Sequence, residues 1–197
     1  MQTALDQSTI QTLSVSGENV FYVDGLMLPE EVEHFSKVAS SLSFRRAERS
    51  HDGDEYSSFS TDFQVEQFSA KVKIGRVSDE LINNLYPDAG YELYRAYINM
   101  SHYGDVEYPH TDCAPDDDDI TVLYYAHHHW NRDWGGETFF YEDQNVVAAI
   151  SPIPGRFLIF PGAIDHVGTV PTRICKTPRF SLAMKYKAKS KPVMNLN

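Results

Sequence analysis

The stretch from Arg156 to Val170 reads RFLIFPGAIDHVGTV, an apolar run at 156–160 followed by a Pro-Gly turn and a second run at 166–170. Similar runs, rich in Val, Ile, Tyr, Phe and Thr, begin near residue 91 and are separated by Gly, Pro and Asp. They cover 92–100, 120–126, 137–141, 146–150 and 179–187. Short, evenly spaced runs of this kind predict the strands of a β-sandwich or barrel rather than strands that alternate with helices.

The residues before this region predict supporting elements around the β core. Residues 19–23 are typical of a short strand. Pro29 and the two glutamates after it favour a helix start, because proline suits the first helical position and acids suit the positive end of the helix dipole. A second helix is expected across residues 67–85. The polar segment 44–64 is interpreted as strand fragments and a mobile loop.

The length of the chain, 197 residues, favours a single domain over residues 1–197. We expect the polar residues 1–17 to be a loose lead-in, residues 18–90 to supply supporting helices and strands, and residues 91–187 to form the core. The fold class is therefore mainly β (α+β), a jelly roll with N-terminal helices. Residues 44–64 and the acidic stretch 114–119 are expected to form a lid at the mouth of the barrel.

Charge and composition exclude several classes of protein. The formal net charge of −11 argues against a nucleic-acid backbone as partner, since phosphate binding needs a basic face. No run of 18 apolar residues predicts a membrane helix, and the N-terminus lacks the pattern of a secretory signal. Two cysteines, Cys113 and Cys175, cannot build a disulfide framework, which favours a cytoplasmic location. The oligomeric state is not indicated.

His110-Thr111-Asp112 is the first candidate site. In an extended segment, residues i and i+2 point to the same face, so His110 and Asp112 can offer an imidazole and a carboxylate to one ion. Two histidines and one carboxylate on one face of iron(II) leave positions open for a co-substrate and oxygen. His166, which follows the 156–160 run, is the best candidate for the third ligand.

His127-His128-His129 is an alternative metal site. Because side chains alternate along a strand, at most two of the three can face one ion. They also stand where the chain leaves a predicted strand. We therefore interpret them as part of a solvated loop.

A cation for an acidic co-substrate is the next requirement. 2-Oxoglutarate would chelate such an iron through its keto and C1 carboxylate oxygens, and its C5 carboxylate would need a buried cation, for which the planar fork of arginine is suited. Arg179 opens the last apolar run, and Ser181 shares its face if that run is extended. Lys176 and Arg173, in the turn before it, are alternatives.

The C-terminal half resembles the 2-oxoglutarate/iron(II) oxygenases of the prolyl-hydroxylase type. The resemblance covers roughly residues 91–187 and rests on six motifs in the right order. These are His110-Thr111-Asp112, Val122-Leu123-Tyr124-Tyr125, Trp134-Gly135-Gly136-Glu137-Thr138-Phe139, Pro154-Gly155-Arg156-Phe157-Leu158-Ile159-Phe160-Pro161, His166-Val167 and Arg179-Phe180-Ser181-Leu182. It implies a double-stranded β-helix in which the His-Asp-His set binds iron(II) and Arg179 binds the C5 carboxylate.

The resemblance also implies two tyrosine roles. Tyr125 matches a strand tyrosine that adds a hydrogen bond to the C5 carboxylate, and Tyr103 resembles a tyrosine near the iron-bound end of 2-oxoglutarate. The turn between His166 and Arg179 is longer than is usual in that branch. Some prolyl hydroxylases use a lysine there, so Lys176 stays open as the carboxylate partner.

The implied reaction hydroxylates an unactivated C–H bond and converts 2-oxoglutarate and O2 into succinate and CO2. No peptide-binding insertion is evident, which favours a small-molecule or amino-acid-like substrate, with peptidyl prolyl hydroxylation as the alternative. Asp112 favours hydroxylation over halogenation, because iron halogenases of this type lack the carboxylate. A non-enzymatic metal-binding β-sandwich and a cupin-type dioxygenase without 2-oxoglutarate are the remaining hypotheses.

Overall fold

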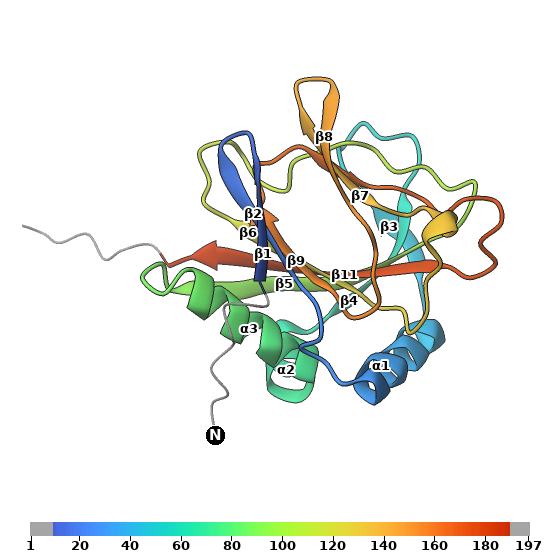
Figure 1. The fold of residues 1–197 in the computed structure, drawn as a ribbon, viewed down its shortest axis with the longest axis horizontal. Helices are drawn as coiled ribbons and strands as arrows, with labels where there is room; N and C mark the ends of the chain where they lie inside the picture. The colour runs from blue at the N-terminus through green and yellow to red at the C-terminus, as the bar shows by residue number, and fades with distance from the viewer. Residues whose placement is uncertain (1–9, 190–197) are drawn as a thin grey trace, which may run out of the picture.

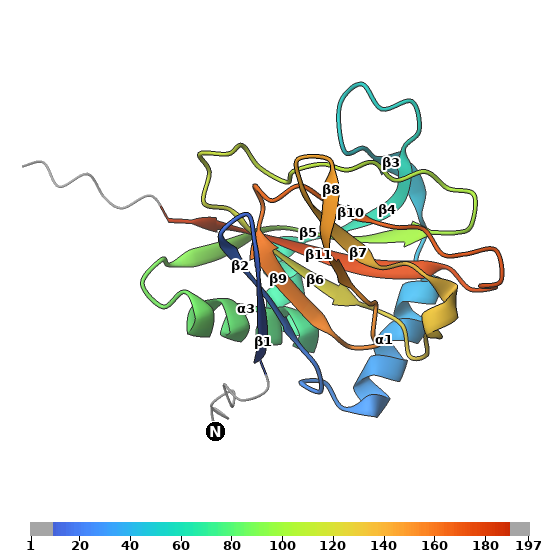
Figure 2. The ribbon, with the colours of Figure 1, turned by 45° about the horizontal axis from the view of Figure 1, so that its top comes forward.

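Two antiparallel sheets face each other in the computed structural model, which describes residues 10–189 (Figures 1 and 2). The larger sheet has the order β1 (Ile10–Val15), β2 (Glu18–Val23), β9 (Phe157–Pro161), β6 (Ile120–Tyr125), β11 (Arg179–Ala188), β5 (Tyr91–Ser101), β4 (Ser58–Phe63) and β3 (Arg45–Glu48). The smaller sheet has the order β10 (His166–Gly168), β7 (Thr138–Glu142) and β8 (Asn145–Ile150). This is the double-stranded β-helix that the resemblance implied.

Three helices cover the outer face of the larger sheet (Figure 1). α1 (Pro29–Ser41) begins at the predicted proline, and the Glu31 carboxylate accepts a hydrogen bond from the Leu28 backbone N–H. The single helix expected over 67–85 is instead two, α2 (Val65–Lys71) and α3 (Lys73–Leu85). Val72 between them has extended φ and ψ of −101° and 122°, and it packs against the core. A short 3-10 helix, η2 (Arg132–Trp134), precedes β7.

The prediction that residues 1–17 form a loose lead-in is wrong for residues 10–17. Residues 10–15 form β1, which pairs in register with β2. Ser16 and Gly17 both have positive φ, 52° and 81°, the backbone conformation that a tight two-residue hairpin requires. Residues 1–9 lie outside the described part of the chain. The segment 44–64 does contain strand fragments, β3 and β4, joined by a loop over 49–57.

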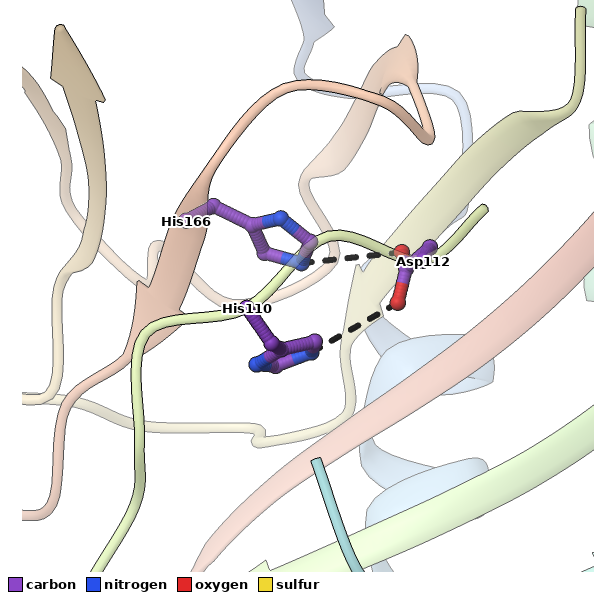
Figure 3. Close-up of side chains that lie close together, drawn as sticks. All are labelled: His110, Asp112 and His166. Atoms are coloured by element: carbon purple, nitrogen blue, oxygen red, sulfur yellow. Dashed lines mark ion pairs between the residues drawn. The ribbon is translucent and has the colours of Figure 1, made fainter. Parts of the chain in front are cut away.

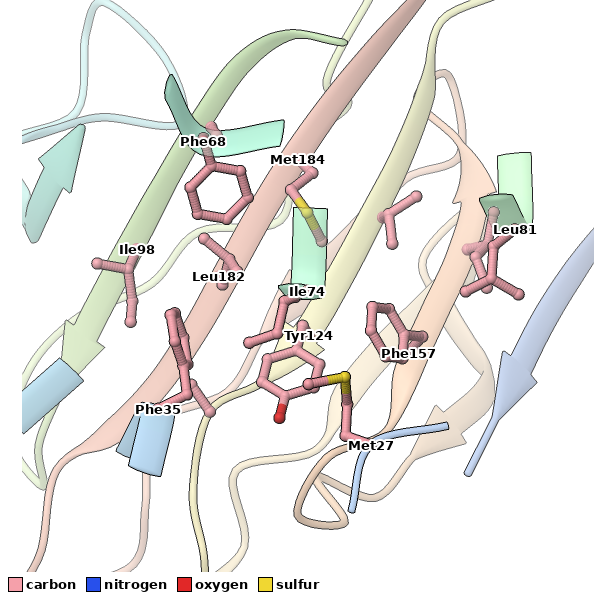
Figure 4. Close-up of a cluster of buried hydrophobic side chains, with 14 of the residues drawn as sticks. Met27, Phe35, Phe68, Ile74, Leu81, Ile98, Tyr124, Phe157, Leu182 and Met184 are labelled. Carbon is pink, nitrogen blue, oxygen red and sulfur yellow. The ribbon is translucent and has the colours of Figure 1, made fainter. Parts of the chain in front are cut away.

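The strands at the centre of the larger sheet are buried on both faces. On β6, Val122 and Tyr124 pack under the helices, whereas Tyr125 points into the space between the sheets. β9 alternates in the same way. Figure 4 shows the helix-side cluster, in which Phe35 from α1 meets residues of β6, β9 and β11. This double burial fixes the register of β11, because a slip of one residue would exchange its two faces.

The core under the helices should be intolerant of cavities. Leu182 is completely buried on β11 within the cluster of Figure 4. Leu182→Ala is expected to lower the free energy of unfolding by about 2–5 kcal/mol, measured by denaturant titration. Val147→Ala on the exposed strand β8 is the control and should stay within about 0.5 kcal/mol of the parent. Equal effects would mean that Leu182 is not a core residue.

Within residues 10–189, no helix is long and apolar enough to cross a membrane.

Candidate metal centre

His110, Asp112 and His166 converge at the inner face of the barrel (Figure 3). His166 opens β10, and His110 forms an isolated bridge with it through hydrogen bonds in both directions of 2.9 and 3.0 Å. The Asp112 backbone N–H donates to Gly162 O at 2.7 Å. The ligand atoms of the three residues all lie within 4.8 Å of one another, and each imidazole Nε2 is 3.5 Å from a carboxylate oxygen of Asp112.

Both histidines present the nitrogen that a metal needs. Nδ1 of His110 lies 2.8 Å from Tyr108 O, and Nδ1 of His166 lies 2.8 Å from Ile164 O. A carbonyl oxygen only accepts, so Nδ1 carries the proton and donates, which leaves the lone pair on Nε2 facing Asp112. Burial lowers the pKa of His166 to about 4, which keeps this ring neutral. The donor set fits an iron(II) site of the two-histidine, one-carboxylate type.

Asp112 is held as a carboxylate by two further neighbours. The Lys185 ammonium forms an ion pair with its Oδ2, and Thr121 Oγ1 donates to the same oxygen at 2.5 Å. Burial alone would raise the pKa of Asp112, but the charge of the neighbouring Lys185 ammonium outweighs it and holds that pKa well below its usual value. A charged oxygen is therefore available to a cation.

Arg179 lies at the inner end of the same site. Its Nε donates to Gly136 O at 2.7 Å, one Nη donates to Ser181 Oγ at 3.0 Å, and the other lies 3.4 Å from Thr138 Oγ1. The residue is only 3% exposed, and within residues 10–189 it forms no ion pair with a carboxylate. Burial lowers the pKa of its guanidinium. A buried cation without a counterion is a site for an anion.

Two glycines make room for this guanidinium. Gly136 has a φ of 83°, and a Cβ added there would lie 3.1 Å from Arg179 Cδ. A Cβ on Gly168 would lie 3.2 Å from one Nη of Arg179. The Trp-Gly-Gly motif seen in the sequence thus has a physical reason, which is the close approach of β7 to the Arg179 side chain.

A cavity of about 50 Å³ joins Arg179 to the three candidate metal ligands. It adjoins a second cavity of about 230 Å³, and both are lined by Tyr97, Asn99, Glu107, His110, Asp112 and Lys185. The second cavity reaches the loop over residues 49–57, where His51 Nε2 lies 3.2 Å from Pro109 O. The inner cavity lies between the buried guanidinium and the His-Asp-His set, and the outer cavity lies on the other side of His110 and Asp112, toward the surface.

The two predicted tyrosines have different positions. Tyr125 is fully buried behind Arg179: its hydroxyl lies 2.8 Å from Thr138 Oγ1, and the guanidinium carbon lies 5.5 Å from its ring centroid. It therefore contacts Arg179 with its ring and also reaches it through Thr138. Tyr103 is 61% exposed and lines neither cavity, so the structure does not bring it to the iron-bound end of a co-substrate.

The competing cations and histidines lie elsewhere. Lys176 and Arg173 are exposed in the turn before β11 and line neither cavity, which supports Arg179 as the anion partner. His127 is buried and accepts a hydrogen bond from the Phe180 N–H, so it is structural rather than solvated. His128 lies 3.2 Å from Ser36 Oγ. Within residues 10–189, the only candidate metal cluster is the one at Asp112.

Of the two segments that were expected to form a lid, only residues 44–64 lie beside the cavities. The loop over residues 49–57 contacts the segment before His110, and Ser50 lies beside Tyr108 O. The acidic stretch 114–119 does not border these cavities. Pro115, Asp117 and Asp118 instead line a separate groove between the β1–β2 and β7–β8 hairpins.

Lys185 and Asn99 also line the site, although neither was predicted from the sequence. Both line the two cavities, and Asn99 Oδ1 is buried without a hydrogen-bond partner in the described part of the chain. A signal for Lys185 existed, because residues 179, 181, 183 and 185 of one strand share a face with the predicted Arg179. Asn99 had no comparable signal. Its strand was predicted, but no predicted site residue on that strand indicated which of its two faces points into the barrel.

Comparisons with known proteins agree with this geometry. Residues 98–186 match the family model of the 2OG-Fe(II) oxygenase superfamily. The fold is similar to a Trichoplax adhaerens prolyl hydroxylase, solved with a peptide fragment of the hypoxia-inducible-factor oxygen degradation domain (20% identity, TM-score 0.65, 86% of this chain and 83% of that chain). It is also similar to a Pseudomonas putida prolyl-4-hydroxylase (16% identity, TM-score 0.67, 87% of this chain and 93% of that chain). A third similar structure is the α-ketoglutarate-dependent epimerase SnoN from nogalamycin biosynthesis (13% identity, TM-score 0.62, 86% of this chain and 78% of that chain). No curated protein sequence matches the chain.

Proposed function

We propose, from the premise that residues 98–186 belong to the 2-oxoglutarate/iron(II) oxygenase superfamily, that this chain hydroxylates an unactivated C–H bond of a small, amino-acid-like molecule. In the balanced reaction, the substrate, 2-oxoglutarate and O2 give the hydroxylated product, succinate and CO2. We further propose that residues 1–197 act as one domain. The observation that carries the proposal is the cavity that joins a buried guanidinium, which forms no ion pair in the described part of the chain, to a two-histidine, one-carboxylate cluster.

His110, Asp112 and His166 would hold the iron(II), which when bound supplies the activation of O2. Arg179 would bind the C5 carboxylate of 2-oxoglutarate as a bidentate pair, because its planar fork matches two carboxylate oxygens. Ser181 and Thr138 orient the fork, and Tyr125 orients Thr138. The chain thus positions the co-substrate between a fixed cation and the metal, and burial keeps water away from both.

The outer cavity supports a small polar substrate. Its volume of about 230 Å³ is below the roughly 300–1,000 Å³ of sites for drug-sized ligands. Charges of both signs line it, with Arg49 at the rim and Glu107 further in, beside the Asn99 amide. A molecule that carries an ammonium and a carboxylate, as an amino acid does, could pair with both. Lys185 and the metal ligands form the floor.

Prolyl hydroxylation of a peptide is the second candidate. Two of the similar structures are prolyl hydroxylases, and the name of the one from Trichoplax adhaerens includes a bound peptide fragment. The loop over residues 49–57 and the rim residue Arg49 are exposed and could contact a chain longer than one residue. Free proline and proline-containing peptides therefore both belong in a substrate screen.

The experiment that tests this proposal measures succinate formed from 2-oxoglutarate in the presence of iron(II) and O2. Free amino acids, related small molecules and peptides are screened, and mass spectrometry detects the gain of one oxygen. Succinate formation that increases with a small molecule supports the proposal. A gain of oxygen only on peptides favours the second candidate. O2 uptake without 2-oxoglutarate would indicate a cupin-type activity, and no turnover despite metal binding would indicate a non-enzymatic metal-binding protein.

A further inference from the structure

Lys185 is a buried cation that the proposed chemistry does not itself require. Its side chain is 8% exposed and lies on β11, between β5 and β6 of the larger sheet. Besides its ion pair with Asp112 Oδ2, its Nζ donates to Thr121 Oγ1 at 3.1 Å. Its register opposite Thr121 is fixed by the β6 pairing, and a β-bulge follows it at Tyr186. The ammonium is therefore held beside the carboxylate.

The two oxygens of Asp112 have different surroundings. Oδ2 receives both Lys185 and the Thr121 hydroxyl and lies 3.5 Å from His166 Nε2, while Oδ1 faces only His110 Nε2, also at 3.5 Å. A carboxylate with one oxygen already engaged by two donors has the other free for a metal. Lys185 therefore orients Asp112 before any metal arrives.

The formal charges around the inner cavity cancel. Its lining includes two carboxylates, Glu107 and Asp112, and two cations, Arg179 and Lys185. A divalent metal that enters alone adds two positive charges near a fixed ammonium, which is unfavourable in a buried site. The 2-oxoglutarate dianion together with the metal adds no net charge. Without Lys185 the lining would be negative, and the metal alone would bind more readily.

We propose that Lys185 is a positioning residue that holds Asp112 by Oδ2 and that its charge increases the dependence of divalent-metal binding on 2-oxoglutarate beyond what direct chelation gives. The proposal rests on the proposed function, since it assumes that the His-Asp-His set binds metal and that Arg179 binds the co-substrate. By linkage, the metal must raise the affinity for 2-oxoglutarate by the same factor as 2-oxoglutarate raises the affinity for the metal.

The test uses Mn(II) binding to the full chain, followed by the EPR signal of the free ion, with and without saturating 2-oxoglutarate. In the parent protein, 2-oxoglutarate should tighten Mn(II) binding. In Lys185→Met, Mn(II) alone should bind about tenfold more tightly or better, and the factor by which 2-oxoglutarate tightens Mn(II) binding should fall by the same amount, while the part that comes from direct chelation of the metal remains. Lys185→Gln, which can still donate a hydrogen bond but has no charge, should behave like Lys185→Met. Lys185→Arg should retain the coupling.

Lys187→Met is the matched control, because Lys187 is an exposed residue two positions along the same strand, and it should leave both constants unchanged. Circular dichroism checks that each variant is folded; if Lys185→Met does not fold, Lys185→Gln decides. Unchanged or weaker Mn(II) binding in the folded uncharged variants, with coupling intact, would overturn the proposal. If instead the parent binds no Mn(II), or His166→Ala binds it equally well, the proposed function itself fails.

Discussion

Replacing His166 with alanine is expected to abolish metal binding and 2-oxoglutarate turnover while the protein remains folded. His166 is one of three candidate ligands, and its Nε2 faces Asp112 from a ring that burial keeps neutral. Loss of an outer partner of a metal ligand costs roughly 10–100-fold in affinity or activity, so loss of a ligand itself should exceed that. Mn(II) binding and succinate formation are the two measurements.

His110→Ala and Asp112→Ala should have the same effect on turnover. Asp112→Ala needs a stability measurement as well, since it leaves the buried Lys185 ammonium without its carboxylate, a loss of about 3–5 kcal/mol. His129→Ala is the matched control, because this exposed residue belongs to the alternative histidine run and should retain full metal binding. Full activity in any one of the three ligand variants would show that the assigned cluster is not the catalytic metal site.

Arg179→Ala is expected to raise the 2-oxoglutarate concentration needed for half-maximal turnover by at least about two orders of magnitude. Removing one partner of a buried charge pair costs about 3–5 kcal/mol, and ~1.4 kcal/mol corresponds to a factor of ten. Mn(II) binding in the absence of 2-oxoglutarate should survive, because Arg179 is not a ligand. Titration of 2-oxoglutarate in the succinate assay measures the change.

Three further variants test whether the loss of 2-oxoglutarate affinity is specific to the Arg179 guanidinium. Arg179→Lys keeps the charge but loses the planar fork, so its effect should be intermediate. Tyr125→Phe should cost on the order of 0.5–1.5 kcal/mol, as one hydrogen bond to Thr138 would. Lys176→Ala, on an exposed turn, should have little effect. The reverse ranking, with Lys176→Ala severe and Arg179→Ala harmless, would transfer the role to Lys176 and leave the metal site standing.

The core strands and the candidate metal ligands could be predicted from the sequence because both depend on local pattern. The apolar runs from residue 91 onward match β5 to β11 closely, since strand period and turn residues are properties of neighbours along the chain. His110 and Asp112 could be paired because two positions along an extended segment share a face. His166 and Arg179 followed from the order of the motifs and from their places at the starts of strands.

Several other features were decided only by the tertiary structure. The resemblance implied that Tyr103 lies near the co-substrate, but its side chain is 61% exposed to solvent. Residues 10–15 look like a polar lead-in by themselves and become a strand because the edge of β2 is available to pair with them. The extended backbone at Val72, which divides a helical pattern in two, is another example, since the residue packs against the core.

For Lys185, the sequence determines one property and the tertiary structure determines another. Alternation from Arg179 places its side chain on the inner face, and that much is present in the sequence. What it meets there depends on the approach of residues more than sixty positions away, Thr121 on β6 and Asp112 after the bridge to His166. A one-dimensional pattern gives the direction of a side chain, whereas its partners and its net electrostatic surroundings are set by which strands the fold brings together.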